Sequence, residues 1–132
     1  MMDAPTDVTP EEIDELLAFL PGFEQPGRKF IRAWRGGDGT FPYPVYDEDV
    51  MAFFRLTGQG VWSDYQYEPR TAGEMLYSDA VIAAATIQQI KTMLTYCVRG
   101  ERFSDGHWAH VLKTGRIQAL LHRLAALRQE LR

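Results

Sequence analysis

Apolar residues recur at helical spacing through the last third of the chain, and this is the most regular pattern in the sequence. A first run begins at Ile87 and ends at Gly100. A second run is expected to be capped by Ser104 or Asp105 and to close at Gly115, and a third run follows it. Such short turns join neighbouring helices, so the pattern predicts a compact antiparallel helical unit. The predicted apolar positions are Ile87, Ile90, Met93, Leu94, Cys97, Val98, Trp108, Val111, Leu112, Ile117, Leu120, Leu121, Leu124 and Leu127.

A further helix is predicted close to the N-terminus by its cap and by its apolar stripe. Thr9 suits the N-cap position, and Glu12 completes a capping box with it. We expect Pro21-Gly22 to end this helix. Its apolar stripe consists of Ile13, Leu16, Leu17 and Leu20.

The middle of the chain predicts additional helices. One is expected to begin near Asp47, where three consecutive acidic residues favour the positive end of a helix dipole, and to end at Gly58. Shorter helical segments are expected at 70–77 and 79–84.

Residues 21–46 have a different character, because four prolines in this range prevent a long helix. The segment 35–40 contains three glycines and an aspartate, which is typical of a turn. Phosphate-binding loops are also rich in glycine, but no Gly-Lys-Ser/Thr follows here, so a plain turn is favoured. The aromatic-rich flanks, 30–34 and 41–46, are consistent with a short hairpin or with an extended wrap.

These elements predict a mainly α fold: a small helical bundle in one domain that spans residues 1–132. Residues 79–131 are expected to form its regular helical core, with the N-terminal aromatic and proline-rich loop region packed over them. Residues 1–8 are expected to be frayed. The hydrophobic fraction of 45% and the charged fraction of 24% exclude a wholly disordered or collagen-like chain.

The cysteine content limits the chemistry. Cys97 is the one cysteine, so no internal disulfide can form, and a structural zinc site would need more ligands than are clustered here. Its place in an apolar stripe predicts a buried thiol rather than a nucleophile. The first residues lack the features of a secretory signal, and no apolar stretch is long enough to cross a bilayer. We therefore expect a cytoplasmic protein without membrane association, and nothing in the sequence implies a cofactor.

The net charge of −4 is unevenly distributed along the chain. Residues 1–90 hold 6 Lys/Arg and 15 Asp/Glu, a balance of −9, whereas residues 91–132 hold 8 Lys/Arg and 3 Asp/Glu, a balance of +5. Either the two parts pack together and complement each other, or the basic part binds an anionic partner. The acidic charge of the whole chain favours the first interpretation.

The densest group of polar side chains lies around the turn before the second C-terminal helix. His107 and His110 are three residues apart and can share a helix face, where Asp105 could join them as ligands of a divalent metal. The same side chains could form a histidine base that a carboxylate orients. Helix capping and surface pairing are favoured over both, because the spacing matches no standard motif. The candidate polar site is Arg102, Asp105, His107 and His110.

Aromatic side chains in the predicted loops form a second candidate. Such residues can stack on ligands or on proline-rich peptides. In a small helical protein they more often extend the core, and this alternative is favoured. The candidate aromatic surface is Trp34, Tyr43, Tyr46, Trp62, Tyr65 and Tyr67.

One string of the C-terminal part resembles a known family. Residues 94–107, with Arg102-Phe103-x-x-Gly106-His107 at their centre, are similar to small bacterial proteins catalogued as domain of unknown function 6508. The resemblance spans most of the chain, although the aromatic loop at 62–67 departs from the family pattern. The family has no assigned activity, so the resemblance implies none here. Its other matching parts are Phe23 to Gly27, Asp38-Gly39, Pro42-Tyr43 to Tyr46, Gly115 and Leu120 to Leu124.

Two kinds of association remain open. The helix–turn–helix spacing of residues 87–113 and the basic C-terminal helices suggest nucleic-acid binding. The element that would enter a groove is poor in Arg, Asn and Gln, so this interpretation is disfavoured. A homodimer could form through the last helix. Its candidate face is Leu120, Leu121, Leu124 and Leu127.

The sequence contains no strong catalytic constellation, but it has many loop aromatics and a divided charge. We therefore favour a non-catalytic interaction or accessory protein that binds another protein. The alternative is a small enzyme, or a metal- or ligand-binding module, centred on Asp105, His107 and His110.

Overall fold

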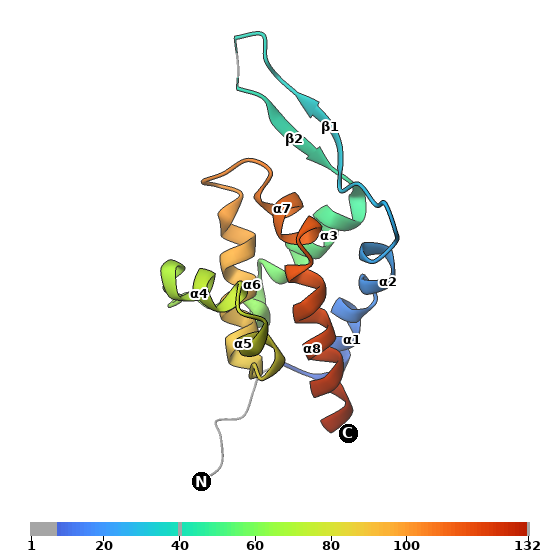
Figure 1. The fold of residues 1–132 in the computed structure, drawn as a ribbon, viewed down its shortest axis with the longest axis vertical. Helices are drawn as coiled ribbons and strands as arrows, with labels where there is room; N and C mark the ends of the chain where they lie inside the picture. The colour runs from blue at the N-terminus through green and yellow to red at the C-terminus, as the bar shows by residue number, and fades with distance from the viewer. Residues whose placement is uncertain (1–7, 40, 132) are drawn as a thin grey trace.

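Helices make up most of the molecule, and a two-stranded hairpin stands at one end of it (Figure 1). This confirms the mainly α class. The computed structural model describes residues 8–39 and 41–131. Within them the elements are α1 (Pro10–Leu17), α2 (Leu20–Phe23), β1 (Ile31–Arg35), β2 (Tyr43–Tyr46), α3 (Glu48–Thr57), the 3-10 helix η1 (Gly60–Trp62), α4 (Pro69–Leu76), α5 (Asp79–Ala83), α6 (Ile87–Gly100), α7 (His107–Lys113) and α8 (Arg116–Glu130).

Helix α8 lies against most of the other helices, and its apolar stripe is enclosed by them. It contacts α1, α2, α5, α6 and α7. Leu120, Leu121 and Leu124 have no exposed surface, whereas Leu127 is partly buried. The predicted stripe is therefore confirmed. The first three of these leucines are covered by the chain's own helices, so they are not available as the expected homodimer face.

One continuous core joins the two halves of the chain. Its buried residues run from Val8 to Leu124, so the N-terminal helices belong to the core as much as residues 79–131 do. Across the halves the Phe54 ring of α3 stacks on Trp108 of α7, and within the N-terminal half the Phe53 ring packs edge-on against Phe19 at 5.4 Å and Phe23 at 5.3 Å between ring centroids. Edge-to-face contacts of this kind add to the burial of apolar surface.

The hairpin pairs β1 with β2 in antiparallel fashion, with Trp34 opposite Pro44. The turn at 36–39 contains three glycines with positive φ, as a tight turn requires. Of the two forms that the sequence left open, the hairpin is the one present. It projects from the helical body instead of packing over it (Figure 1). At its base Tyr46 is 6% exposed and joins the core.

The first helix ends differently from the prediction. The capping box of Thr9 and Glu12 is confirmed, but α1 ends at Leu17. Pro21-Gly22 lies inside α2 and does not end a helix. Proline is tolerated in a first helical turn, because its missing N–H would have no partner there.

Ion pairs connect the acidic and basic parts of the chain. Each joins a basic residue of α8 to an acidic residue far away in sequence, which supports the predicted internal complementarity. The pairs are Arg116–Asp79 at 2.8 Å and Arg128–Asp14 at 2.9 Å, and His122 of the same helix is hydrogen-bonded to Glu24 at 2.8 Å.

The first residue that the structure describes lies in the core. Val8 is 4% exposed, although the sequence predicted fraying through this residue. The rest of that prediction concerns residues 1–7, which lie outside the described part of the chain. Among the residues described, no helix has the length and apolar character needed to cross a lipid bilayer.

Arg28 joins the end of α2 to the start of α3. Its guanidinium donates to the Gly22 carbonyl at 2.9 Å and to both carboxylate oxygens of Asp49, one of them at 2.8 Å. The side chain is 14% exposed and also lies over the Phe30 ring, 5.0 Å from its centroid. The guanidinium lowers the pKa of the Asp49 carboxyl. One cation therefore fixes the entry and the exit of the hairpin.

Replacing Arg28 by methionine should lower the free energy of unfolding by about 1–2 kcal/mol, because Asp49 and the Gly22 carbonyl lose their partner. Urea denaturation measures this change. Arg70→Met is the matched control, because Arg70 pairs with Glu74 on the exposed face of α4. Its effect should stay below about 0.5 kcal/mol. Equal effects of the two substitutions would contradict the role of Arg28.

Candidate binding surface

Glu101, the residue after α6, binds three parts of the chain with one carboxylate. Oε1 accepts from the Tyr46 hydroxyl at 2.8 Å and from the Trp108 backbone N–H at 2.9 Å. Oε2 accepts from the Gly106 backbone N–H at 2.8 Å. Burial, together with this carboxylate, raises the pKa of the Tyr46 phenol. The base of the hairpin, the end of α6 and the start of α7 are thus held together.

Glu101 also supplies the cap of α7. The prediction that Ser104 or Asp105 caps this helix is wrong, because the N-cap residue is Gly106 with φ of 90° and no side-chain hydrogen bond. A carboxylate at a helix start satisfies unpaired N–H groups and interacts favourably with the helix dipole. The usual capping side chains lie at the N-cap or within three residues of it, whereas Glu101 lies five residues before it.

Trp108 forms the apolar side of this cluster. Its ring stacks on Phe54 with 4.5 Å between centroids and an 8° angle between planes, and it lies 5.2 Å from the Tyr46 ring. The indole Nε1–H donates to the Val98 carbonyl at 3.1 Å. Stacking and the hydrogen bond therefore hold the ring in one orientation.

An open hollow of about 530 Å³ lies beside this cluster, between α3 and the end of α6. Phe54, Val98 and Trp108 form its apolar lining. Arg55 and Arg102 also line it, and we call it the arginine hollow. Neither guanidinium has an ion pair or a hydrogen bond with any residue that the structure describes. The carboxylate in the lining is Glu101, and its oxygens already have donors. With two arginines and one carboxylate in its lining, the hollow has a net positive charge that is attractive to anionic groups.

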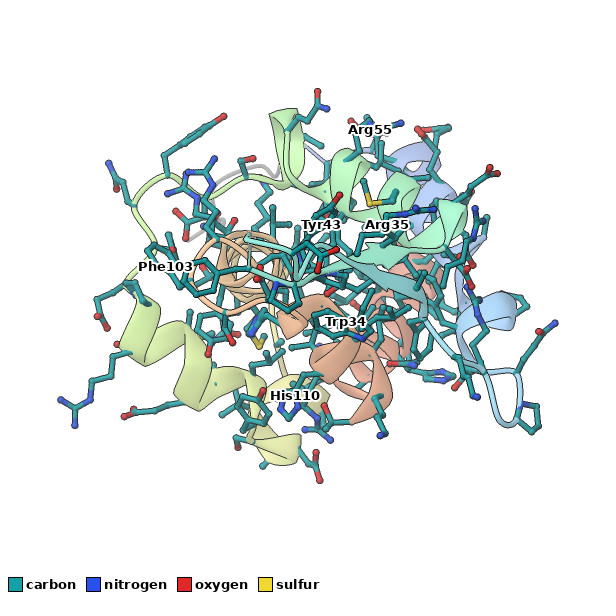
Figure 2. The ribbon with its side chains drawn as sticks, turned by 90° about the horizontal axis from the view of Figure 1, so that it is seen from above. Trp34, Arg35, Tyr43, Arg55, Phe103 and His110 are labelled. Carbon is teal, nitrogen blue, oxygen red and sulfur yellow. The ribbon has the colours of Figure 1, made fainter. Side chains whose placement is uncertain are left out.

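Exposed aromatic side chains lie on the hairpin and in the turn after α6. The exposed fraction is 54% for Trp34, 50% for Tyr43 and 84% for Phe103. Figure 2 looks down on the hairpin, with Trp34, Tyr43 and Arg35 around it and Phe103 to one side. We call Trp34, Arg35, Tyr43, Arg102 and Phe103 the hairpin surface, in which Trp34 lies on one face of the hairpin and its cross-strand pair Arg35 and Tyr43 lies on the other face. It combines large apolar rings with cations that can pair with a partner.

The predicted aromatic surface is divided by the fold. Tyr67 is half-buried, and the guanidinium of Arg99 lies 5.2 Å from the centroid of its ring. Trp34 and Tyr43 remain together on the hairpin, and Tyr65 lies in the loop beside Tyr67. The exposed members are Trp34, Tyr43 and Tyr65 at 75%, and the core members are Tyr46 at 6% and Trp62 at 2%.

The four residues of the predicted polar site are placed in different surroundings. Arg102 lines the arginine hollow, whereas His107 lines a separate pocket of about 260 Å³. Asp105 and His110 are exposed, and the His110 ring lies 6.2 Å from that of Tyr77. Within residues 8–39 and 41–131, no three His, Cys, Asp or Glu side chains are grouped as a metal site requires.

His107 is packed into the helical turn. Its ring lies over Gly100, where an added Cβ would come within 2.3 Å of it, and edge-on to the Tyr96 ring at 5.4 Å. The Nε2 atom is buried and has no hydrogen-bond partner in the described part of the chain. Burial lowers the pKa of this imidazole. The neutral ring therefore fits a packing role better than that of an exposed base.

Cys97 is fully buried in α6, as its position in the apolar stripe predicts. Burial raises the pKa of its thiol. A thiol that stays protonated and covered behaves as a small apolar group.

The sequence gives no signal for Arg55, and it places Glu101 in the densest polar cluster without indicating the role of this residue. Arg55 gives no local signal, because a basic residue in the last turn of a helix is ordinary dipole compensation. Glu101 reads as one more charge in a polar turn. Their roles depend on α3, α6 and the hairpin lying together, which no spacing in the sequence reports.

The fold and the surface define a small mainly α domain with one projecting hairpin. Residues 8–130 match the model of a family of unknown function (DUF6508), and the chain belongs to this family. Membership confirms the resemblance found in the sequence. No curated protein and no solved structure matches the chain.

Replacing Glu101 by glutamine should destabilise the fold by about 1–3 kcal/mol, because the amide NH₂ would face at least one N–H or O–H donor. Urea denaturation measures the change, and faster amide exchange at Gly106 and Trp108 should accompany it. Glu130→Gln at the exposed end of α8 is the control, with an expected effect below about 0.5 kcal/mol. Unchanged exchange at both amides would contradict the three-way contact.

His107 should make stability depend on pH. Its folded-state pKa lies below the ordinary value of 6.5, so the unfolded chain binds more protons between the two values. The stability of the wild type relative to His107→Phe should therefore fall as the pH drops below about 6.5, and level off below the folded-state pKa. Thermal unfolding across this pH range measures the difference. A difference that stays constant with pH would contradict the assignment.

Proposed function

We propose that this protein is a non-catalytic interaction module that binds an acidic segment of another protein with the hairpin surface and the arginine hollow. The hairpin is the observation that carries the proposal. Trp34 and Tyr43 stay about half exposed on a sheet of two strands. A sheet this small gains little burial of its own, and exposed rings of this size mark interaction sites.

Charge complementarity favours an acidic partner. Arg35 and Arg102 have no ion pair with any described residue, Arg35 is the cross-strand partner of Tyr43, and Arg102 precedes Phe103 in the sequence. Arginine forms paired hydrogen bonds with carboxylates and stacks on aromatic faces, so the two residue types work together at binding surfaces. Tryptophan, tyrosine and arginine are also the residues most enriched at energetic centres of interfaces.

Rigidity supports the same function. Glu101 fixes the hairpin base to α6 and α7, and Trp108 fixes the wall of the arginine hollow. A surface that is already ordered loses less conformational entropy when a partner binds. We place the module in the bacterial cytoplasm, because a chain whose one cysteine is buried suits a reducing compartment.

A nucleic acid would also offer anions to these arginines. We favour a protein partner because the whole chain carries a net charge of −4, whereas nucleic-acid-binding domains are usually basic. A second copy of the chain is the other possible occupant, and the experiment below separates the three.

A random peptide library displayed on phage tests the proposal. Selection on the wild-type protein should enrich peptides in which Asp or Glu stands beside apolar residues. The affinity of a selected peptide, measured by fluorescence polarisation, should fall at least about tenfold for Trp34→Ala and for Arg102→Gln.

Two exposed residues away from the hairpin serve as matched controls. Tyr65→Ala and Arg70→Gln should bind the selected peptide as the wild type does. Failure to enrich acidic peptides, or equal binding by Trp34→Ala, would overturn the proposal. Tighter binding of mixed-sequence RNA than of the selected peptide would show that the partner is a nucleic acid. Self-association that is seen in sedimentation and abolished by Trp34→Ala and Arg102→Gln would show that it is a second copy of the chain.

A further inference from the structure

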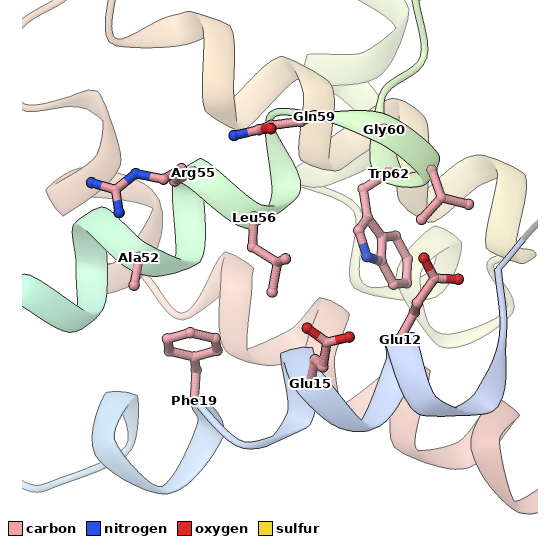
Figure 3. Close-up of a pocket in the computed structure, with 10 residues that line it drawn as sticks. Glu12, Glu15, Phe19, Ala52, Arg55, Leu56, Gln59, Gly60 and Trp62 are labelled. Atoms are coloured by element: carbon pink, nitrogen blue, oxygen red, sulfur yellow. The ribbon is translucent and has the colours of Figure 1, made fainter.

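A second cavity lies between α1 and α3 (Figure 3), and we call it the α1–α3 cleft. Its volume of about 490 Å³ falls in the range of sites for small ligands. The segment after α1 and the helix η1 complete its walls. Its apolar lining consists of Phe19, Ala52, Leu56, Val61 and Trp62.

Trp62 distinguishes this cleft from an ordinary surface depression. Its side chain is 2% exposed, yet its indole N–H has no hydrogen-bond partner among the residues described. In Figure 3 the indole nitrogen is on the side of the ring toward Leu56 and Glu15, so it faces the cleft. Because Nε1 is not one of the buried side-chain atoms without a partner, this donor is open to the cleft. An acceptor on a bound molecule would satisfy it.

Charges of opposite sign stand apart along the cleft. Glu15 lies on the α1 side, with Glu12 beyond it near Trp62, and Arg55 lies on α3 near the other end (Figure 3). In the described part of the chain neither Glu15 nor Arg55 has an ion pair. Glu12 is hydrogen-bonded to Thr9 within the capping box, which leaves its charge uncompensated. The two walls therefore do not neutralise each other.

We infer that the α1–α3 cleft binds a short apolar peptide whose two ends are both ionised. The peptide ammonium lies at Glu15 and Glu12, and the peptide carboxylate lies at Arg55. A backbone carbonyl between them accepts from the indole N–H of Trp62. Apolar side chains of the peptide cover the apolar lining. This ligand supplies the cation, the anion and the acceptor that the cleft lacks, in one molecule.

Three forms of one peptide test the inference: trileucine with free ends, N-acetyl-trileucine and trileucine amide. Isothermal titration calorimetry should detect binding of the free peptide. Each blocked form should bind at least about tenfold more weakly, because it lacks one of the two charges. In a ¹⁵N–¹H spectrum, the indole signal of Trp62 should shift with the free peptide.

Two variants assign the ends of the peptide. Glu15→Gln should reduce the difference between the free and the acetylated peptide, because only Glu12 then faces the ammonium, while it preserves the difference between the free peptide and the amide. Arg55→Gln should reduce the difference between the free peptide and the amide, while it preserves the difference between the free and the acetylated peptide. For each variant, the wild type and the variant measured with the free and the blocked peptide form a thermodynamic cycle. Glu11→Gln is the matched control, because Glu11 is an exposed carboxylate of α1 outside the lining. It should preserve both differences.

Absence of heat with the free peptide, together with an unchanged Trp62 signal, would overturn the inference. Equal affinity for all three forms would also overturn it, because the cleft would then recognise apolar surface alone. Trp34→Ala should leave this binding unchanged. That variant separates the result from the function proposed for the hairpin surface.

Discussion

The carboxylate of Glu101 is the contact on which the position of the hairpin depends. Its two oxygens accept from Tyr46, Gly106 and Trp108, which belong to the hairpin, to the α6–α7 turn and to α7. None of these donors is charged, so the group keeps its negative charge at the start of α7, where the helix dipole favours it. A neutral acceptor in the same place could satisfy donors but could not use the dipole. The Glu101 carboxylate therefore both caps a helix and orients a binding surface.

Elements that depend on neighbouring residues could be predicted from the sequence, and those that depend on distant contacts could not. The capping box at Thr9 and the buried stripe of α8 are local patterns, and the structure contains them. The cap of α7 comes from outside the usual spacing, so Ser104 and Asp105 were wrong choices. Pro21 predicts the end of a helix, but it lies in the first turn of α2, because proline occurs both after helices and at their starts.

The candidate site shows the same limit at the level of single residues. Tyr43 and Tyr46 are three positions apart in one strand, yet one is half exposed and the other is buried against Trp108. Sequence reasoning could name both as aromatic residues of a loop or hairpin. Which ring meets solvent depends on the side of β2 that faces α7, and therefore on Glu101. For Arg102 the residue was predicted, but its neighbour Arg55 was not, because α3 approaches it only in the folded chain.

Pro44 makes the two edges of the hairpin unequal. It lies opposite Trp34, and without an N–H it cannot donate to β1, so its nitrogen lies on the outer edge of β2. That edge has an interrupted row of donors, whereas β1 carries an amide at every position. A further strand can therefore pair with β1 far better than with β2. Two hairpins joined through β1 would leave only the β2 edges free, where Pro44 interrupts the row of donors, so growth of the sheet by further copies is hindered.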